Sequence, residues 1–140
     1  LKKALDLIET QSFTLIPQDD SKVSLAPRLK KEDGLIDWRK SAPEIINQIR
    51  GMSPWPGTFT YYKGRVLKID EAKLQIPSSV ETCRPAPGQI QGVSKKGIVV
   101  STAEGNLLIE RLQPEGRRKM TAAEFVAGHR ISAGERLGEK

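Results

Sequence analysis

The chain has 140 residues, and its 23 Lys and Arg against 17 Asp and Glu give a net charge of +6. This length suits one domain with one hydrophobic core, and charges of both signs, 29% of all residues, exclude wholesale disorder. The positive excess favours an anionic partner, with nucleic acid first and an acidic protein or a membrane surface behind it.

The cysteine content and the hydropathy of the sequence indicate the cellular compartment. Cys83 is the only cysteine, which excludes an intrachain disulfide and a cysteine-based metal cluster and fits a reducing compartment. The sequence holds no apolar run of membrane-spanning length and no signal-peptide core. We therefore expect a cytoplasmic protein without a membrane partner. Because the sequence begins at Leu1 rather than at Met, we also expect a longer parent chain.

The first ten residues predict a helix, because apolar side chains follow helical spacing at Leu1, Leu5 and Ile8. One short amphipathic helix is marginal alone in water, so we expect it to be the end of a helix from an upstream domain. Residues 16–34 predict a connector, because prolines, polar residues and Gly34 interrupt any periodicity.

Residues 41–52, SAPEIINQIRGM, predict the clearest helix. Ser41 and Glu44 form a capping-box pattern, and Pro43 lies in the first turn, where its missing N–H costs little. Isoleucines form the apolar face, and Gly51 followed by Pro54 ends the helix.

From Thr58 onward the apolar period is two. A hairpin is predicted with strands Thr58–Tyr62 and Arg65–Ile76 around a Lys63-Gly64 turn. After a loop, residues 89–114 predict three short strands, broken at Lys96-Gly97 and Glu104-Gly105. A last helix opens with the capping box of Thr121 and Glu124. About five short strands with two short helices predict a mostly β (α+β) domain, a small open β-barrel of the oligonucleotide-binding (OB) type.

No residue pattern in the sequence predicts catalytic chemistry. His129 is the only histidine, and its place at the end of the last helix predicts a solvated residue rather than a base. The segment GVSKKG lacks the spacing of a phosphate-binding loop. The acidic pairs Glu32-Asp33 and Asp70-Glu71 are adjacent in sequence and flanked by lysines, as is typical of solvated faces. We predict no catalytic residue and no metal site.

The positive charge is clustered. The clusters are Arg28, Lys30 and Lys31 in the connector, Lys63, Arg65 and Lys68 in the hairpin, Lys95 and Lys96 in a turn, and Arg117, Arg118 and Lys119 before the last helix. Such cations can follow a phosphate backbone, although lysines at turn tips are also common without any partner. Residues 117–119 are the best candidates, because three adjacent cations repel one another without a counter-charge.

Aromatic residues raise the possibility of base stacking. Tyr61 and Tyr62 point to opposite faces of their strand, so at most one faces outward with the cations. Trp38 is expected in the core. Trp55 stands between Pro54 and Pro56 on a stiff corner, and core packing is favoured for it as well, because an indole carries so much apolar area.

Three blocks in the chain are similar to a known family. They read APRLKKEDGLIDW, IRGMSPWPGTFTYYKGRVLKIDEA and LQPEGRRKMTAAEFVAGHRISAGERL, and the similarity runs from about residue 16 to 137. This pattern resembles the C-terminal domain of methionyl-tRNA formyltransferases. A related domain follows formyltransferase domains in other enzymes that use formyltetrahydrofolate, and the block LQPEGRRKM favours the tRNA enzymes.

The resemblance implies an OB-like barrel that follows a doubly wound N-terminal formyltransferase domain. Residues 1–22 would be the end of that domain and the start of a linker, and residues 23–140 the barrel domain, with the linker continuing to about residue 34. The parent would transfer a formyl group from 10-formyltetrahydrofolate to the methionyl amino group. The family's Ser-Leu-Leu-Pro motif and catalytic Asn/His pair have no counterpart here, so this part is expected to hold neither catalytic residues nor cofactor.

The resemblance also implies that linker and barrel hold the initiator methionyl-tRNA. By position it implicates Arg28, Lys30 and Lys31, and more loosely Arg117, Arg118, Lys119 and Arg130. Lys63 and Arg65 are candidates for tRNA binding on the basis of their charge alone. The other implied partner is the parent's own N-terminal domain, in a monomer of the bacterial cytosol or of an organelle.

Two alternatives stay open. The domain could be a structural piece that orients another formyltetrahydrofolate-using enzyme without binding tRNA, in which case the N-terminal domain would bury Trp55 and the apolar face of residues 1–8. It could also bind single strands by itself, which exposed Tyr and Trp side chains on the basic face would support.

Overall fold

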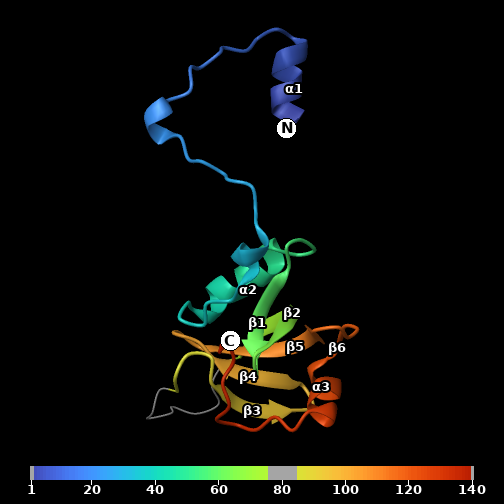
Figure 1. Cartoon of the computed structure of the whole chain (residues 1–140). Coiled ribbons are helices and arrows are strands. Elements are labelled where there is room, and N and C mark those ends of the chain that lie inside the picture. The colour runs from blue at the N-terminus through green and yellow to red at the C-terminus, as the bar shows by residue number, and fades with distance from the viewer. Residues whose placement is uncertain (1, 76–84, 140) are drawn as a thin grey trace.

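The structure is a computed structural model that describes residues 2–75 and 85–139. Figure 1 shows a small barrel with two helices against it, and a separate N-terminal helix at the end of a long linker. The elements in chain order are α1 (Lys2–Glu9), η1 (Asp20–Lys22), η2 (Lys31–Gly34), α2 (Ala42–Gly51), β1 (Thr58–Tyr62), β2 (Arg65–Gln75), β3 (Ile90–Ser94), β4 (Gly97–Ser101), β5 (Asn106–Pro114), β6 (Met120–Thr121) and α3 (Ala122–Gly128).

The strands form one antiparallel sheet in the order β1-β2-β5-β4-β3, with the short β6 paired to β5. The register of β2 on β5 shifts on both sides of Glu71. Such irregularities bend a strand and increase its twist, so the long β2 curves between β1 and β5. The mostly β, OB-like fold predicted from the sequence is confirmed.

The C-terminal segment, residues 134–138, bridges the two outer strands. The Gly138 N–H donates to the Tyr61 oxygen of β1, and the Leu137 N–H donates to the Gly88 oxygen just before β3, each at 2.8 Å. The Ile90 N–H of β3 donates to the Glu135 oxygen at 2.8 Å. Strand edges otherwise present unpaired backbone groups, so this segment completes the barrel between β1 and β3.

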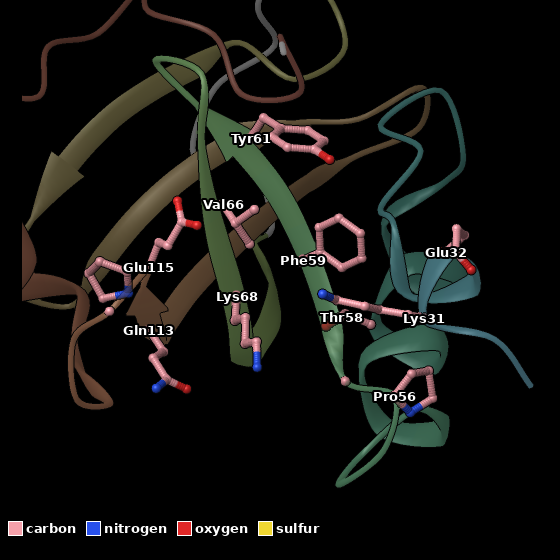
Figure 2. A pocket seen from close by; sticks show the side chains of 13 residues that line it. Lys31, Glu32, Pro56, Thr58, Phe59, Tyr61, Val66, Lys68, Gln113 and Glu115 are labelled. Carbon is pink, nitrogen blue, oxygen red and sulfur yellow. The ribbon is translucent and has the colours of Figure 1, made fainter.

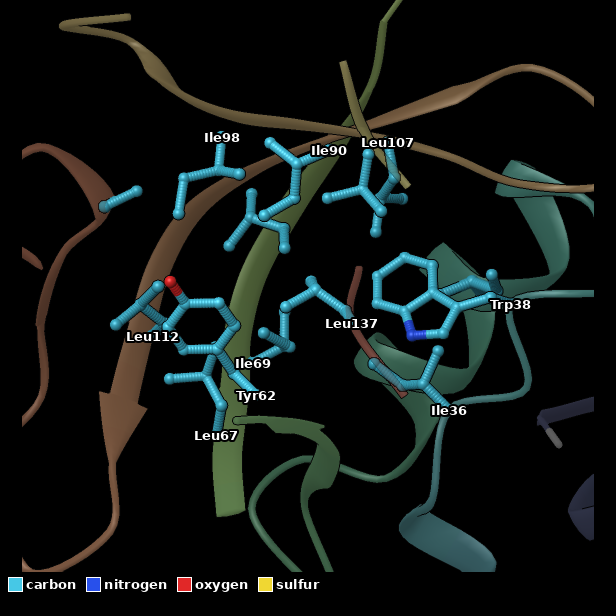
Figure 3. Packing of buried hydrophobic residues seen from close by; sticks show 14 of the residues in the cluster. Ile36, Trp38, Tyr62, Leu67, Ile69, Ile90, Ile98, Leu107, Leu112 and Leu137 are labelled. Carbon is cyan, nitrogen blue, oxygen red and sulfur yellow. The ribbon is translucent and has the colours of Figure 1, made fainter. Parts of the chain in front are cut away.

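The core lies inside the sheet and under α2. Figure 3 shows aliphatic side chains from several strands gathered between the rings of Trp38 and Tyr62. Trp38 is buried as predicted, and its Nε1–H donates to Thr60 Oγ1 at 3.0 Å. This bond satisfies the one polar group of the indole. Leu137 of the C-terminal segment belongs to the same core.

Local signals in the sequence account for the helix starts. In α2, Ser41 and Glu44 form the predicted capping box, and in α3 Thr121 and Glu124 form the second one. Hairpin strands Thr58–Tyr62 and the start at Arg65 are also confirmed. The predicted strand end at Ile76, and Cys83, lie outside the described residues.

The packing prediction for Trp55 is wrong. Its side chain is 60% exposed. The corner after α2 is closed by its own backbone, where the Gly57 N–H donates to the Met52 oxygen at 2.8 Å. The core below is already filled by Trp38 and the isoleucines of α2, so the corner leaves the indole in solvent.

The N-terminal helix α1 forms as predicted, but none of its described residues is buried. Leu5 and Ile8 are 56% and 58% exposed. Whether this helix belongs to an upstream domain stays a prediction. Within residues 2–75 and 85–139, no helix combines the length and the apolar character needed to cross a membrane.

Candidate nucleic-acid interface

The outer face of the β1–β2 hairpin carries an aromatic pair. Because Thr58, Thr60 and Tyr62 point into the core, alternation sends Phe59 and Tyr61 outward. The two rings lie 6.0 Å apart, centroid to centroid, at 86° to one another. The prediction that Tyr61 and Tyr62 point to opposite faces is confirmed.

A groove of about 480 Å³ runs over this pair, and we call it the aromatic groove. Figure 2 shows Phe59 and Tyr61 on β1, Val66 and Lys68 on β2, and Lys31 reaching from η2 beside Phe59. Pro56, Gln113 and Pro114 also line it. Two lysines and two carboxylates, Glu32 and Glu115, balance the charge of its lining.

The end of the linker is fixed against the barrel, which positions Lys31. The Ile36 N–H donates to the Phe59 oxygen at 2.9 Å. The Gln48 amide of α2 donates to the backbone oxygens of Asp33 and Leu35 at 2.9 and 3.1 Å. Gly34 lies so close to the Gly57 carbonyl that a Cβ there would collide with it. Glycine is therefore required where η2 meets the barrel.

A second groove of about 380 Å³ adjoins the first, and we call it the basic groove. Its cations are Lys63 and Arg65 from the hairpin and Arg117 from the β5–β6 turn. Glu115 is its only carboxylate side chain among the described residues. Val66, Pro114 and Glu115 line both grooves, so the two grooves are neighbours that share one wall.

The hairpin turn sets the direction of Lys63 and Arg65. Lys63 and Gly64 have φ values of 51° and 74°, which is the pattern of a type I′ turn and matches the twist of the flanking strands. At the other wall, the Gln113 amide donates to the Arg117 oxygen at 2.8 Å and holds the turn that carries Arg117.

His129 closes the far wall of the basic groove at the C-cap of α3. Its ring packs on Phe125 with centroids 4.3 Å apart, and its Nδ1 lies 3.0 Å from the Phe125 oxygen. Since a carbonyl oxygen only accepts, this contact requires the proton on Nδ1. The side chain is exposed, as predicted for a histidine at a helix end.

Ion pairs divide the predicted cations into two groups. Lys63 pairs with Glu135 at 3.1 Å and lies 4.9 Å from the Tyr62 ring centroid, and hydrogen bonding to Tyr62 and then to Glu135 raises the pKa of Lys63. Lys119 pairs with Asp70 at 2.7 Å. The expectation that residues 117–119 lack a counter-charge is therefore wrong at Lys119, because Asp70 of β2 supplies a carboxylate. Asp70 is far from Lys119 in the sequence, so the sequence alone did not indicate this pair.

The remaining predicted cations are exposed and form no ion pair in the part of the chain that the structure describes. They are Arg28, Lys30, Lys31, Arg65, Lys68, Lys95, Lys96, Arg117, Arg118 and Arg130. Of all the predicted cations, the structure brings Lys31 and Lys68 to the aromatic groove and Lys63, Arg65 and Arg117 to the basic groove. Arg28, Lys30, Arg118, Lys119 and Arg130 line neither groove.

Sequence reasoning did not select Phe59 as a site residue. The signal was present, because alternation from Thr58 places Phe59 on the same outward face as Tyr61. Among residues 2–75 and 85–139, no group of three or more His, Cys, Asp and Glu side chains is arranged to hold a metal ion.

The antiparallel sheet bridged by its C-terminal segment, with cations and aromatics on an outer face, defines a small barrel domain of the OB-like class. Residues 28–130 match the model of the family described as "Formyl transferase, C-terminal domain". The chain belongs to this family of formyl transferase C-terminal domains.

Similar proteins extend over the whole chain. Methionyl-tRNA formyltransferase from Geobacter sulfurreducens is 42% identical over 139 residues, covering 99% of this chain and 42% of that protein. The protein of the same name from Geobacter metallireducens is 43% identical over 138 residues, with the same coverage. The chain thus spans about two fifths of the length of these curated relatives.

Solved structures with the same fold include HypX from Aquifex aeolicus. A variant of HypX aligns with a TM-score of 0.61 at 17% identity, covering 95% of this chain and 23% of HypX. HypX in complex with tetrahydrofolic acid aligns with a TM-score of 0.57, covering 88% of this chain and 21% of HypX. At this identity the likeness concerns the fold.

Proposed function

We propose that the chain is the tRNA-holding C-terminal domain of a methionyl-tRNA formyltransferase. Relatives of that name match its whole length at about 40% identity, and the basic groove collects exposed cations from the hairpin and the β5–β6 turn. The parent enzyme would transfer a formyl group from 10-formyltetrahydrofolate to initiator methionyl-tRNA in the bacterial cytoplasm, with donor and catalytic residues in its N-terminal domain.

The basic groove carries this proposal. Arg65 and Arg117 extend from two turns that are far apart in sequence, and within the described residues neither is engaged in an ion pair. An arginine held this way donates to phosphate oxygens without first giving up a carboxylate partner. Phosphate contacts of this kind fix position and carry no sequence information. The chain would therefore hold tRNA while other parts of the parent read its identity.

A salt titration of tRNA binding tests the proposal. We expect affinity of this chain for initiator tRNA to fall steeply as salt rises, because each phosphate contact releases counterions. Arg65→Ala and Arg117→Ala should each lower the log–log salt slope by about 1 and weaken binding to every tRNA alike. Lys96→Ala is the matched control, since Lys96 is an exposed cation outside both grooves. Absent or salt-independent binding would refute the proposal.

The second candidate is a docking domain that orients a formyltransferase domain without touching tRNA. The exposure of Trp55 and of the apolar side chains of α1 favours it. The same titration separates the two functions, because a docking domain binds tRNA no better than the Arg65→Ala Arg117→Ala double variant does.

A further inference from the structure

We propose that the aromatic groove is a site for one unpaired nucleotide of the bound RNA, with its base in the aromatic groove and an adjacent phosphate in the basic groove. This inference rests on the proposed function and specifies which element of the nucleic acid the domain holds.

The aromatic groove and the basic groove differ in charge, as the base and the phosphate of a nucleotide do. The aromatic groove balances Lys31 and Lys68 against Glu32 and Glu115, so it suits a neutral base better than a phosphate. The basic groove has three cations, Lys63, Arg65 and Arg117, against one glutamate in its lining. Lys63 is already paired with Glu135, so Arg65 and Arg117 are the cations that remain for a phosphate. A nucleic-acid strand carries a neutral base beside each anionic phosphate. The aromatic groove and the basic groove are likewise next to each other, on either side of the wall that contains Val66 and Pro114.

The surfaces of the aromatic groove match the two kinds of contact a base makes. The Phe59 and Tyr61 rings are nearly perpendicular, so a flat base stacks on one ring and meets the edge of the other. The volume of about 480 Å³ lies within the range of pockets that hold small molecules. Glu32, Glu115 and Gln113 on the rim provide acceptors for exocyclic amino groups.

Stacking in this groove needs a base that is free of a duplex. A paired base has its faces covered by its neighbours in the helix, whereas an unpaired base offers a whole face to an aromatic ring. The site therefore selects loops, bulges or ends over double helix. A phosphate-only domain would have no such preference.

The test compares a short single strand of cytidines, which carry an exocyclic amino group, with an RNA duplex of the same length, by fluorescence anisotropy on the 140-residue chain at low salt. We expect tighter binding of the single strand. Phe59→Leu and Tyr61→Leu keep apolar volume and remove the ring. We expect at least one of them to weaken single-strand binding about tenfold, the scale of one stacking contact, while duplex binding and the salt slope stay unchanged.

Trp55→Leu is the matched control, because Trp55 is an exposed aromatic residue that does not line the groove. Unchanged single-strand binding in both folded groove variants overturns the inference, whether or not Trp55→Leu loses binding. Equal affinity for strand and duplex in the unsubstituted chain also overturns it. Either result leaves the proposed function intact if tRNA binding still depends on salt and on Arg65 and Arg117.

Photo-crosslinking decides the matter if the groove variants fail to fold. With 5-iodouridine in the single strand and the unsubstituted chain, we expect the crosslink at Phe59 or Tyr61, assigned to the residue by peptide fragmentation. A crosslink confined to other residues, Trp55 included, overturns the inference without need of a variant.

Discussion

The Tyr62 hydroxyl donates a 2.8 Å hydrogen bond to the Glu135 carboxylate and thereby joins the first strand of the barrel to the segment that completes it. Lys63 reaches the same carboxylate at 3.1 Å. The Tyr62 hydrogen bond, followed by the Lys63 contact, lowers the pKa of Glu135. One carboxylate therefore holds the C-terminal segment to the hairpin that also carries Arg65 of the basic groove.

Glu135→Gln should lower the free energy of unfolding at neutral pH by about 1 kcal/mol, because a partly exposed charged acceptor is replaced by a neutral one. The pKa of Glu135 is lower in the folded chain, so its contribution is present above the ordinary glutamate value and is lost as pH falls through the lowered value. Urea unfolding at neutral and acid pH should show a variant that loses less stability on acidification. Glu139→Gln, at an exposed glutamate just after the C-terminal segment, is the control.

Leu137→Ala tests whether the C-terminal segment is part of the core. Leu137 is 5% exposed, and truncating a buried leucine costs about 2–5 kcal/mol. The control Leu74→Ala, at a leucine that is 52% exposed, should change the free energy of unfolding by no more than about 0.5 kcal/mol. Equal effects in denaturant titrations would show that the segment does not pack into the barrel.

Much of the barrel was predictable because its signals are local. Capping boxes at Ser41 and Thr121 and the alternation from Thr58 depend on residues within a few positions of one another. The sequence offered no such signal for the C-terminal segment, because Gly138 bonds to Tyr61, a residue far from it in the sequence. Short elements such as β6 carry too few residues to show a period.

The sequence could predict which type of residue forms the candidate site, but not how these residues are arranged in space. Charge clusters pointed to Arg65 and Arg117, yet only the pairing of β2 with β5 brings their turns to one groove. The same pairing places Asp70 beside Lys119. Lys119, which looked unpaired in the sequence, therefore has a counter-charge. The prediction that Trp55 packs in the core was wrong, because a large apolar side chain is buried only where the core has room for it.

The exposure of Trp55 has a spectroscopic consequence. Trp55 is 60% exposed and Trp38 is 5% exposed, so acrylamide should quench mainly the Trp55 emission. Trp55→Phe should leave a blue-shifted spectrum with little quenching, because only the buried indole remains. If the variant is quenched as strongly as the unsubstituted chain, Trp38 is accessible and the core around Thr60 is not packed as the hydrogen bond at 3.0 Å indicates.

The Lys119–Asp70 ion pair predicts an unequal role for the adjacent cations in RNA binding. Lys119 already has a carboxylate 2.7 Å away, so Lys119→Ala should weaken tRNA binding less than Arg117→Ala does. Asp70→Asn keeps the shape and removes the charge, and it should steepen the log–log salt slope by up to about 1 by freeing Lys119 for phosphate. Lys119→Ala should then cost more in the Asp70→Asn background than alone, a coupling measured as a double-mutant cycle. Additive effects would mean that the ion pair does not restrain Lys119 in solution.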